Sequence, residues 1–190
     1  IPVSSKNHYL TRQEIGKLLE QLGSQGLRDY LIGLTLILLG LRVSELVAIR
    51  GNHFFADPLG TSVWLTVENG KGGKSREVKV PDRLCQLITQ YMDERRGSGA
   101  VGAWAGEADW MRSDARLFPL STRQVERIIR GACEKIRLEK KVTPHWLRHT
   151  NATLALLNGA TLQQVQENLG HSHINTTQRY LHTVGQIKKA

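Results

Sequence analysis

The chain has 190 residues, 40% of them hydrophobic, which fits one domain of ordinary size, at most with a small appendage, and argues against global disorder. Lysine and arginine number 26 against 17 aspartate and glutamate residues, giving a formal net charge of +9. This surplus makes nucleic acid the first candidate partner, and a basic protein with no polyanionic partner is the alternative that net charge leaves open.

The two cysteines, Cys85 and Cys133, are far apart and form no CxxC pattern, so they indicate neither a zinc site nor a disulfide framework. A reduced cytoplasm is the simplest compartment for such a chain. The most apolar stretch, residues 31–41, is too short for a bilayer, which takes about 20 apolar residues, and predicts a buried core helix. The first residues show no signal-peptide pattern and no initiator methionine, so we expect a piece of a longer protein.

In chain order, the first predicted helix begins at a capping box over residues 11–14. It ends near Gly26 and carries one apolar face, formed by Ile15, Leu18, Leu19 and Leu22. A second helix over about 26–40 is apolar nearly all round, which indicates a central position, and Gly40 ends it. A short helix over about 43–49 follows.

Residues 61–80 combine β-rich and alternating segments around a glycine-rich turn at 70–73, which predicts a β-hairpin. Pro81 then opens a helix that reaches about Arg96. Residues 97–116 are aperiodic, and we expect them to form a long surface loop.

A second capping box over residues 121–124 starts a helix with one apolar stripe. Several arginines lie off that stripe: Arg123, Arg127, Arg130 and Arg137. A Thr-Pro pair then begins a helix over 143–159, with His145 in its first turn. Shorter helical pieces follow at 161–169 and 175–181. The predicted fold class is therefore mainly α with a small antiparallel β-sheet (α+β), in one domain.

Two arginines and a histidine are the first candidates for chemistry. His145 and Arg148 are three residues apart at a predicted helix N-terminus, where they share a face and are suited to hold a phosphate. The alternative is a surface His and Arg that cap the helix. Arg42 follows the most apolar helix and is either a second guanidinium for a phosphate or a structural partner of Glu45, one turn on.

Lys71 and Lys74 lie at the predicted hairpin tip, as exposed turn lysines or as groups that enter a DNA groove or protonate a leaving oxygen. The GxxxxGK[ST] spacing of a phosphate-binding loop is missing. His171 and His173 indicate a metal site only weakly, because no nearby carboxylate or cysteine supports them. Tyr180 taken alone is ordinarily a packing residue.

The order of these residues resembles the tyrosine recombinase or phage integrase family, and in particular its Xer-like members. The strings that carry the resemblance are GLRVSEL (40–46), NGKGGKSREVKVP (69–81), TPHWLRHT (143–150) and LGHSHINTTQRYLH (169–182). The spacings from Arg148 to His171 and from His171 to Tyr180 also look like those of the family, and the likeness extends from about Leu10 to His182.

The resemblance implies the catalytic-domain fold of that family and a DNA strand transferase that needs no metal, no ATP and no other cofactor. It implies catalytic roles for Arg42, Lys71, His145, Arg148, His171 and Tyr180. The two arginines and His171 would hold the scissile phosphate, and Tyr180 would attack it to form a 3′-phosphotyrosyl link. His145 would act as base or orient Tyr180, and Lys71, in the first Gly-Lys-Gly, would be the general acid rather than Lys74.

The resemblance also implies partners. We expect double-stranded DNA with specific recombination sites, a homo-tetramer on DNA with a monomeric isolated domain, no membrane, and action in the cytoplasm on the nucleoid. Further expected DNA contacts are Lys74, Arg76, Arg123 and Arg127. Relatives usually carry an N-terminal core-binding domain that completes a clamp around DNA, and we expect this chain to be a catalytic domain that lacks it.

Three other functions stay open at this point. A type IB topoisomerase-like enzyme would share the chemistry and relax supercoils without a partner site. A regulatory relative would bind DNA without cutting it, although the complete residue set argues against a decayed site. A basic metal-binding module would use the histidines near residue 171. The pattern does not separate integration, excision and dimer resolution, since these depend on groove contacts and DNA shape.

Overall fold

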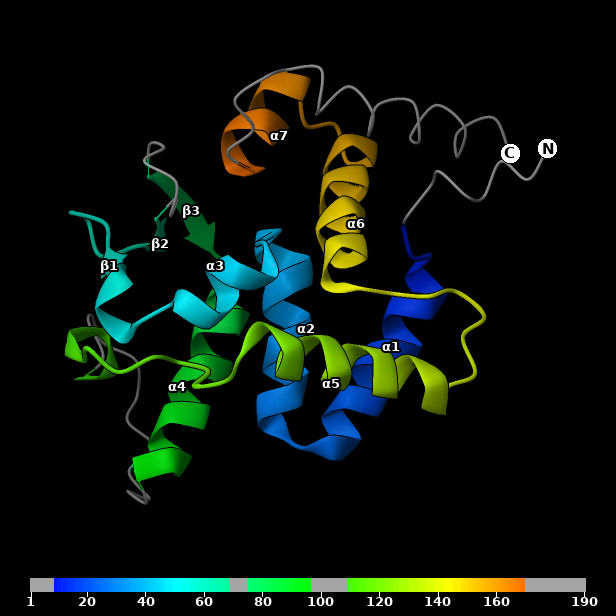
Figure 1. The fold of residues 1–190 in the computed structure, drawn as a ribbon. Helices are drawn as coiled ribbons and strands as arrows, with labels where there is room; N and C mark the ends of the chain where they lie inside the picture. Colours follow the sequence, from blue (N-terminus) through cyan, green and yellow to red (C-terminus); the bar gives the residue numbers. More distant parts are fainter. Residues whose placement is uncertain (1–8, 69–74, 97–108, 170–190) are drawn as a thin grey trace.

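The computed structural model of the chain describes residues 9–68, 75–96 and 109–169. Helices form most of the molecule, and a small sheet lies at one side of it (Figure 1). The described helices are α1 (Arg12–Gln25), α2 (Leu27–Leu39), α3 (Val43–Ala48), α4 (Asp82–Arg96), α5 (Thr122–Lys135), α6 (Pro144–Leu157) and α7 (Leu162–Leu169). The strands are β1 (Phe54–Ala56), β2 (Val63–Val67) and β3 (Arg76–Val80), with short 3₁₀ turns at η2 (Gly51–His53) and η3 (Asp109–Arg112). The predicted α+β class is confirmed.

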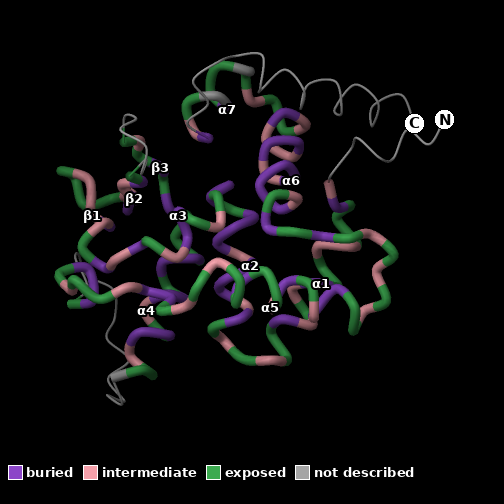
Figure 2. Tube along the Cα trace, in the orientation of Figure 1, coloured by how far each residue is buried: buried purple, intermediate pink, exposed green. Residues whose placement is uncertain are grey.

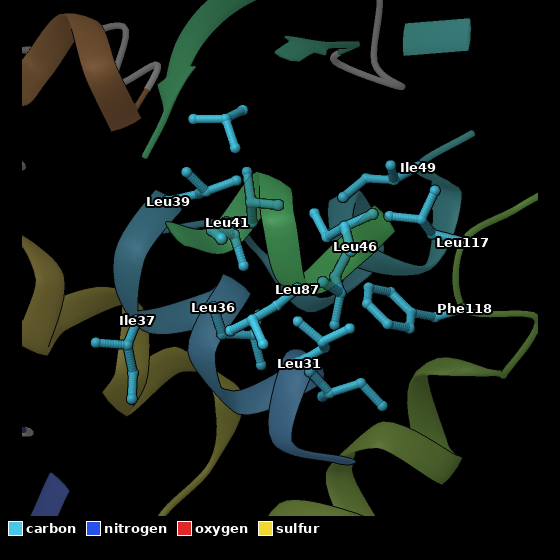
Figure 3. Packing of buried hydrophobic residues seen from close by; sticks show 14 of the residues in the cluster. Leu31, Leu36, Ile37, Leu39, Leu41, Leu46, Ile49, Leu87, Leu117 and Phe118 are labelled. Atoms are coloured by element: carbon cyan, nitrogen blue, oxygen red, sulfur yellow. The ribbon is translucent and has the colours of Figure 1, made fainter. Parts of the chain in front are cut away.

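Helix α2 lies at the centre of the fold, as its apolar sequence predicts. It packs against α1, α3, α4, α5, α6 and β3. Its residues Leu31, Leu36 and Leu39 lie in the buried cluster of Figure 3 together with Leu87 of α4 and Phe118. Its N-cap, Gly26, makes no side-chain capping bond. Each fully buried leucine contributes about 1.5–3 kcal/mol, so burial rather than capping places this helix.

The helices around α2 begin where the sequence patterns predict. Thr11 and Ser121 each close a capping box, at the start of α1 and of α5. Thr143 is the N-cap residue of α6 and Pro144 is its first helical residue, although the Thr143 hydroxyl makes no capping bond. Proline fits there because the first helical N–H has no partner within the helix. These local signals fix where each helix enters the core.

The sheet is antiparallel in the order β1-β2-β3, and β2 and β3 form the predicted hairpin. Its tip, residues 69–74, lies outside the described residues. Strand β1 is a third strand that the sequence patterns missed, because three residues are too few to show an alternation. Along β3, Arg76, Val78 and Val80 share one face, since side chains alternate in a strand.

The surface-loop expectation for 97–116 is wrong at its described end. The turn η3 buries Trp110 and Met111. Figure 2 shows buried tube, in purple, among exposed tube in this part of the molecule, below the label of β1. The Trp110 ring meets Phe54 edge to face at a centroid distance of 5.0 Å, and its Nε1 donates to Thr89 Oγ1 at 3.0 Å. Those partners come from β1 and α4, so local periodicity could not reveal them. Within the described ranges, no helix is both long and apolar enough to cross a membrane.

Candidate active site

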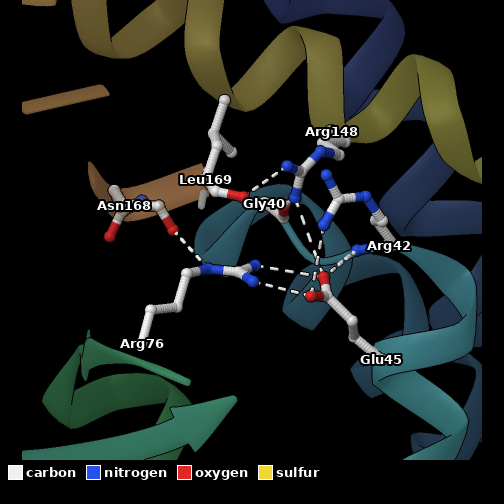
Figure 4. A network of polar contacts seen from close by, with 7 residues as sticks. All are labelled: Gly40, Arg42, Glu45, Arg76, Arg148, Asn168 and Leu169. Atoms are coloured by element: carbon white, nitrogen blue, oxygen red, sulfur yellow. Dashed lines mark hydrogen bonds and ion pairs between the residues drawn. The ribbon is translucent and has the colours of Figure 1, made fainter. Parts of the chain in front are cut away.

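Three arginines and one glutamate converge where the end of α2, the start of α3, strand β3, helix α6 and the end of α7 meet (Figure 4). These residues, Arg42, Glu45, Arg76 and Arg148, are called the arginine cluster below. The Glu45 carboxylate lies at the centre, and each guanidinium approaches it from a different element. Three positive groups around one negative group leave a local surplus of positive charge.

Arg148 is the most deeply buried member of the arginine cluster, with only 3% of its side chain exposed. Its Nη1 donates to the carbonyl oxygen of Gly40 and lies 3.7 Å from Glu45 Oε1, and its Nη2 donates to the carbonyl oxygen of Leu169. Gly40 is the C-cap residue of α2, and Leu169 is the last residue of α7. Helix C-termini carry unsatisfied carbonyls and partial negative charge, so both ends stabilise the buried cation.

Gly40 makes this arrangement possible through its backbone. Its φ of 65° is left-handed, which a glycine adopts without steric cost. An added Cβ would lie 2.7 Å from Asn151 Oδ1 and 2.8 Å from Leu169 Cδ2. The close approach of α6 and α7 to the end of α2 therefore depends on glycine, and it brings the carbonyl of Gly40 to Arg148.

Arg42 is the exposed member, with 43% of its side chain open to solvent. It is the N-cap residue of α3, and its backbone N–H donates to Glu45 Oε1 at 2.8 Å. Its Nη1 lies 3.5 Å from Glu45 Oε2, a long contact for an ion pair. The structure thus shows the pairing with Glu45 that the structural interpretation predicts, and it leaves the Arg42 side chain partly accessible to a ligand.

Glu45 is ionised in this setting. Burial alone raises the pKa of its carboxyl group, but the hydrogen bonds from Arg76 and from the Arg42 backbone, with the charges of Arg76 and Arg148, outweigh burial and lower the pKa below its usual value. Arg76 makes the shortest contacts, from Nη1 to Oε2 at 2.6 Å and from Nη2 to Oε1 at 3.0 Å. The carboxylate therefore holds the three arginines at one point.

His145 lies in the first turn of α6, one turn before Arg148, as predicted. It is exposed, whereas Arg148 points into the protein. The same helix end therefore presents an imidazole at the surface and anchors a guanidinium beneath it. Among the described residues, no group of three His, Cys, Asp or Glu side chains is placed to hold a metal ion.

The model of the phage integrase family matches residues 8–186. The chain belongs to this family. It is 38% identical over 159 residues to tyrosine recombinase XerC of Pelobacter propionicus, covering 83% of this chain and 48% of that protein. It is 36% identical over 185 residues to tyrosine recombinase XerA of Thermococcus kodakarensis, covering 95% of this chain and 60% of that protein. The chain thus spans about half to three-fifths of the length of these relatives.

Solved structures agree with this assignment to the integrase family. The crystal structure of XerA recombinase matches with a TM-score of 0.72 and 32% identity, over 90% of this chain and 57% of that one. The catalytic domain of bacteriophage HP1 integrase matches with a TM-score of 0.64 and 26% identity, over 92% of this chain and 86% of that one. The resemblance to tyrosine recombinases and the catalytic-domain fold that it implies are both confirmed.

Four of the expected integrase site residues, Lys71, Lys74, His171 and Tyr180, lie outside the described residues. The described chain leads up to them, because β3 follows the hairpin tip that holds both lysines and α7 ends two residues before His171. Of the expected sites in the described part, the structure joins Arg42 and Arg148 through Glu45. His145 lies on the same helix as Arg148.

The expected DNA contacts fall into two groups. Arg123 and Arg127 are exposed on α5, away from its buried stripe, which suits a contact with DNA. Arg76 turns inward, with 10% of its side chain exposed, and contacts Glu45 and the carbonyl oxygen of Asn168. The signal that places it is the alternation of β3, since Arg76 shares the face of Val78 and Val80. Sequence reasoning saw Glu45 only as a partner of Arg42.

Proposed function

We propose that this chain is the catalytic domain of a site-specific DNA recombinase that cleaves and rejoins strands through a 3′-phosphotyrosyl intermediate. The observation that supports the proposal is the arginine cluster, in which the fixed guanidinium of Arg148 and the accessible guanidinium of Arg42 share Glu45, in a member of the phage integrase family. A phosphodiester resists attack because its oxygens are negative, so a catalyst must first neutralise that charge.

In the proposed reaction, Arg42 and Arg148 bind the non-bridging oxygens of the scissile phosphate, and His171 adds a hydrogen bond. The phenol oxygen of Tyr180 attacks phosphorus, and the bond from phosphorus to the 5′-oxygen breaks. His145 takes the phenol proton or orients Tyr180, and Lys71 gives a proton to the departing 5′-oxygen. Rejoining reverses these steps with the 5′-hydroxyl of another strand, so the covalent link conserves the energy and no ATP is consumed.

The proposed partner is double-stranded DNA that carries specific recombination sites. Recombinase XerH, 27% identical to this chain with a TM-score of 0.67, has been solved bound to a palindromic difH substrate in a post-cleavage complex. We propose a homo-tetramer on two such sites in the nucleoid, with the isolated domain monomeric. Lys74, Arg123 and Arg127 are proposed to contact the DNA backbone, which accounts for part of the surplus of basic residues.

The test is covalent trapping on a library of nicked duplexes with a randomised core, which also identifies the site. We expect the wild-type chain to give a protein–DNA adduct that survives SDS and Tyr180→Phe to give none. Tyr9→Phe, which removes a phenol oxygen far from this site in sequence, is the matched control and should keep the adduct. An adduct with Tyr180→Phe, or none with the wild type, would overturn the proposal. Relaxation of plasmid without a specific sequence would favour the topoisomerase-like function.

A further inference from the structure

Arg76 has a position that a DNA contact does not explain. It begins β3 and lies on the buried face of that strand, with its side chain 10% exposed. Its guanidinium bridges two partners, because Nη1 and Nη2 bind both oxygens of Glu45 and Nε donates to the carbonyl oxygen of Asn168 at 2.8 Å. All three guanidinium nitrogens are therefore engaged inside the protein.

The carboxylate of Glu45 contacts the three arginines at unequal distances. Its oxygens lie 2.6 and 3.0 Å from the guanidinium of Arg76, against 3.5 Å from that of Arg42 and 3.7 Å from that of Arg148. Charge-assisted fork bonds to Arg76 are the strong ones, and the two longer contacts are weaker. While Arg76 occupies the carboxylate, Arg42 keeps more of its charge and its donors for a phosphate, and Arg148, whose Nη atoms donate to two carbonyls, keeps more of its charge.

The second partner of Arg76 links the sheet to α7. Asn168 and Leu169 are the last two residues of that helix, and their carbonyls accept from Arg76 and from Arg148 respectively. Two arginines from different elements thus hold the C-terminal end of α7, which packs against both β3 and α6. His171 follows two residues after Leu169 in sequence, so the position of this helix end determines where the next segment starts.

We propose that Arg76 is a positioning residue of the recombinase site. It holds Glu45 so that the carboxylate does not neutralise Arg42 and Arg148, and it fixes the end of α7 from which the chain continues to His171. The inference rests on the proposed function, since the phosphate it prepares for is the scissile phosphate. It replaces our expectation that Arg76 contacts DNA, and it differs from a purely structural role because it acts through the charge of Glu45.

The first test measures the rate of adduct formation in fully bound complexes on the trapped substrate. We expect Arg76→Ala to slow cleavage on the order of 100-fold, as small displacements of catalytic groups do. Arg76→Lys should be nearly as slow, because an ammonium is a point charge and cannot reproduce the fork. Lys79→Ala, which removes the same charge from an exposed position of β3, should keep the wild-type rate.

DNA affinity separates positioning from DNA contact. Loss of a side chain that contacts a phosphate lowers the slope of log affinity against log salt by about 1, and replacing that side chain by lysine restores the slope. We expect Arg76→Ala to bind with the wild-type salt slope, and a slope lowered as for a lost contact would overturn the inference.

The double variant Arg76→Ala/Glu45→Gln tests the route through Glu45. Without Arg76 the carboxylate is available to pair with Arg42 and Arg148, so removing its charge should raise the rate on the order of 10-fold above that of Arg76→Ala. A purely structural role predicts a double variant slower than either single one. Thermal melts of all variants show whether each is folded at the assay temperature.

Amide hydrogen exchange in α7 gives a measurement that needs no cleavage. We expect Arg76→Ala to speed exchange at the C-terminal end of α7 on the order of 10-fold, because one of its anchors is lost. If the wild type forms no adduct, the proposed function fails and the catalytic part of the inference fails with it. If the wild type forms adduct and Arg76→Ala matches its rate, or if α7 exchange is unchanged, only the inference is overturned.

Discussion

The start of α6 and the start of α3 each contribute one arginine to the same cluster, and they do so in opposite ways. At α6, Arg148 is buried and donates to the carbonyls that end α2 and α7. At α3, Arg42 is exposed, and its guanidinium has one long contact with Glu45. A phosphate site can therefore combine one preorganised cation with one accessible cation.

The difference follows from desolvation. A guanidinium taken out of water needs several partners to offset the loss of hydration, and two helix C-termini with a shared carboxylate supply them to Arg148. An exposed guanidinium keeps its hydration and needs no such partners. Fold stability and chemistry are therefore coupled at Arg148 and separable at Arg42.

The largest expected effect on stability comes from removing the Arg148 side chain. Arg148→Ala leaves two carbonyls and part of Glu45 without their buried donor, so we expect it to lower the free energy of unfolding by about 3–5 kcal/mol. Arg42→Ala should lower it by less than about 1 kcal/mol, although both variants should lose the covalent adduct. Urea melts measure the difference between the two variants. Equal losses of stability would show that Arg148 is no more important to the fold than Arg42.

A change in the backbone at Gly40 tests how the end of α2 is held against Arg148. Gly40→Ala must hold alanine in a left-handed conformation and bring its Cβ close to Asn151 and Leu169, so we expect a loss of about 2 kcal/mol. Gly16→Ala is the matched control, because its Cβ meets nothing within 4 Å inside α1. That control should gain about 0.5–1 kcal/mol in thermal or urea melts. A Gly40→Ala protein as stable as the wild type would show that α2 does not need this geometry.

The pH dependence of stability tests the shared carboxylate. The pKa of Glu45 is lowered in the folded protein, so its ionised form stabilises the fold above its unfolded value of 4.5. This contribution is lost as the pH falls through the lower folded pKa. We expect the stability gap between wild type and Glu45→Gln to be full above about pH 5 and to shrink in acid. Glu126→Gln, at an exposed position of α5, controls for the loss of one charge. A gap independent of pH would contradict a stabilising role for the ionised carboxylate of Glu45.

The smallest expected effect concerns an arginine outside the cluster. Arg127 is exposed on α5, so Arg127→Ala should weaken DNA binding a few-fold and lower the salt slope by about 1. Its free energy of unfolding should change by less than about 0.5 kcal/mol. Binding titrations over a range of salt concentrations measure the slope. An unchanged slope would remove Arg127 from the proposed DNA contacts.

The extent to which sequence predicted this molecule depends on how far apart the partners are in the chain. The capping boxes at Thr11 and Ser121 use neighbours three residues away, and both were found. The pairing of Trp110 with Phe54 and the bonds from Arg76 to Glu45 join distant segments, and no local pattern reveals them. The resemblance to tyrosine recombinases selected Arg42 and Arg148, and the structure adds how each is held. The assignments of Lys71, His171 and Tyr180 stay predictions.

The alternation along β3 has a consequence for insertions and deletions. Arg76, Val78 and Val80 face inward, whereas Glu77 and Lys79 face outward. One residue added between Arg76 and Val78 would reverse the parity at this position and turn Arg76 toward solvent, unless a bulge absorbed it. A residue added before Arg76, in the turn, would leave the parity intact. The hairpin can therefore vary in length at its tip while the paired part of β3 keeps its register.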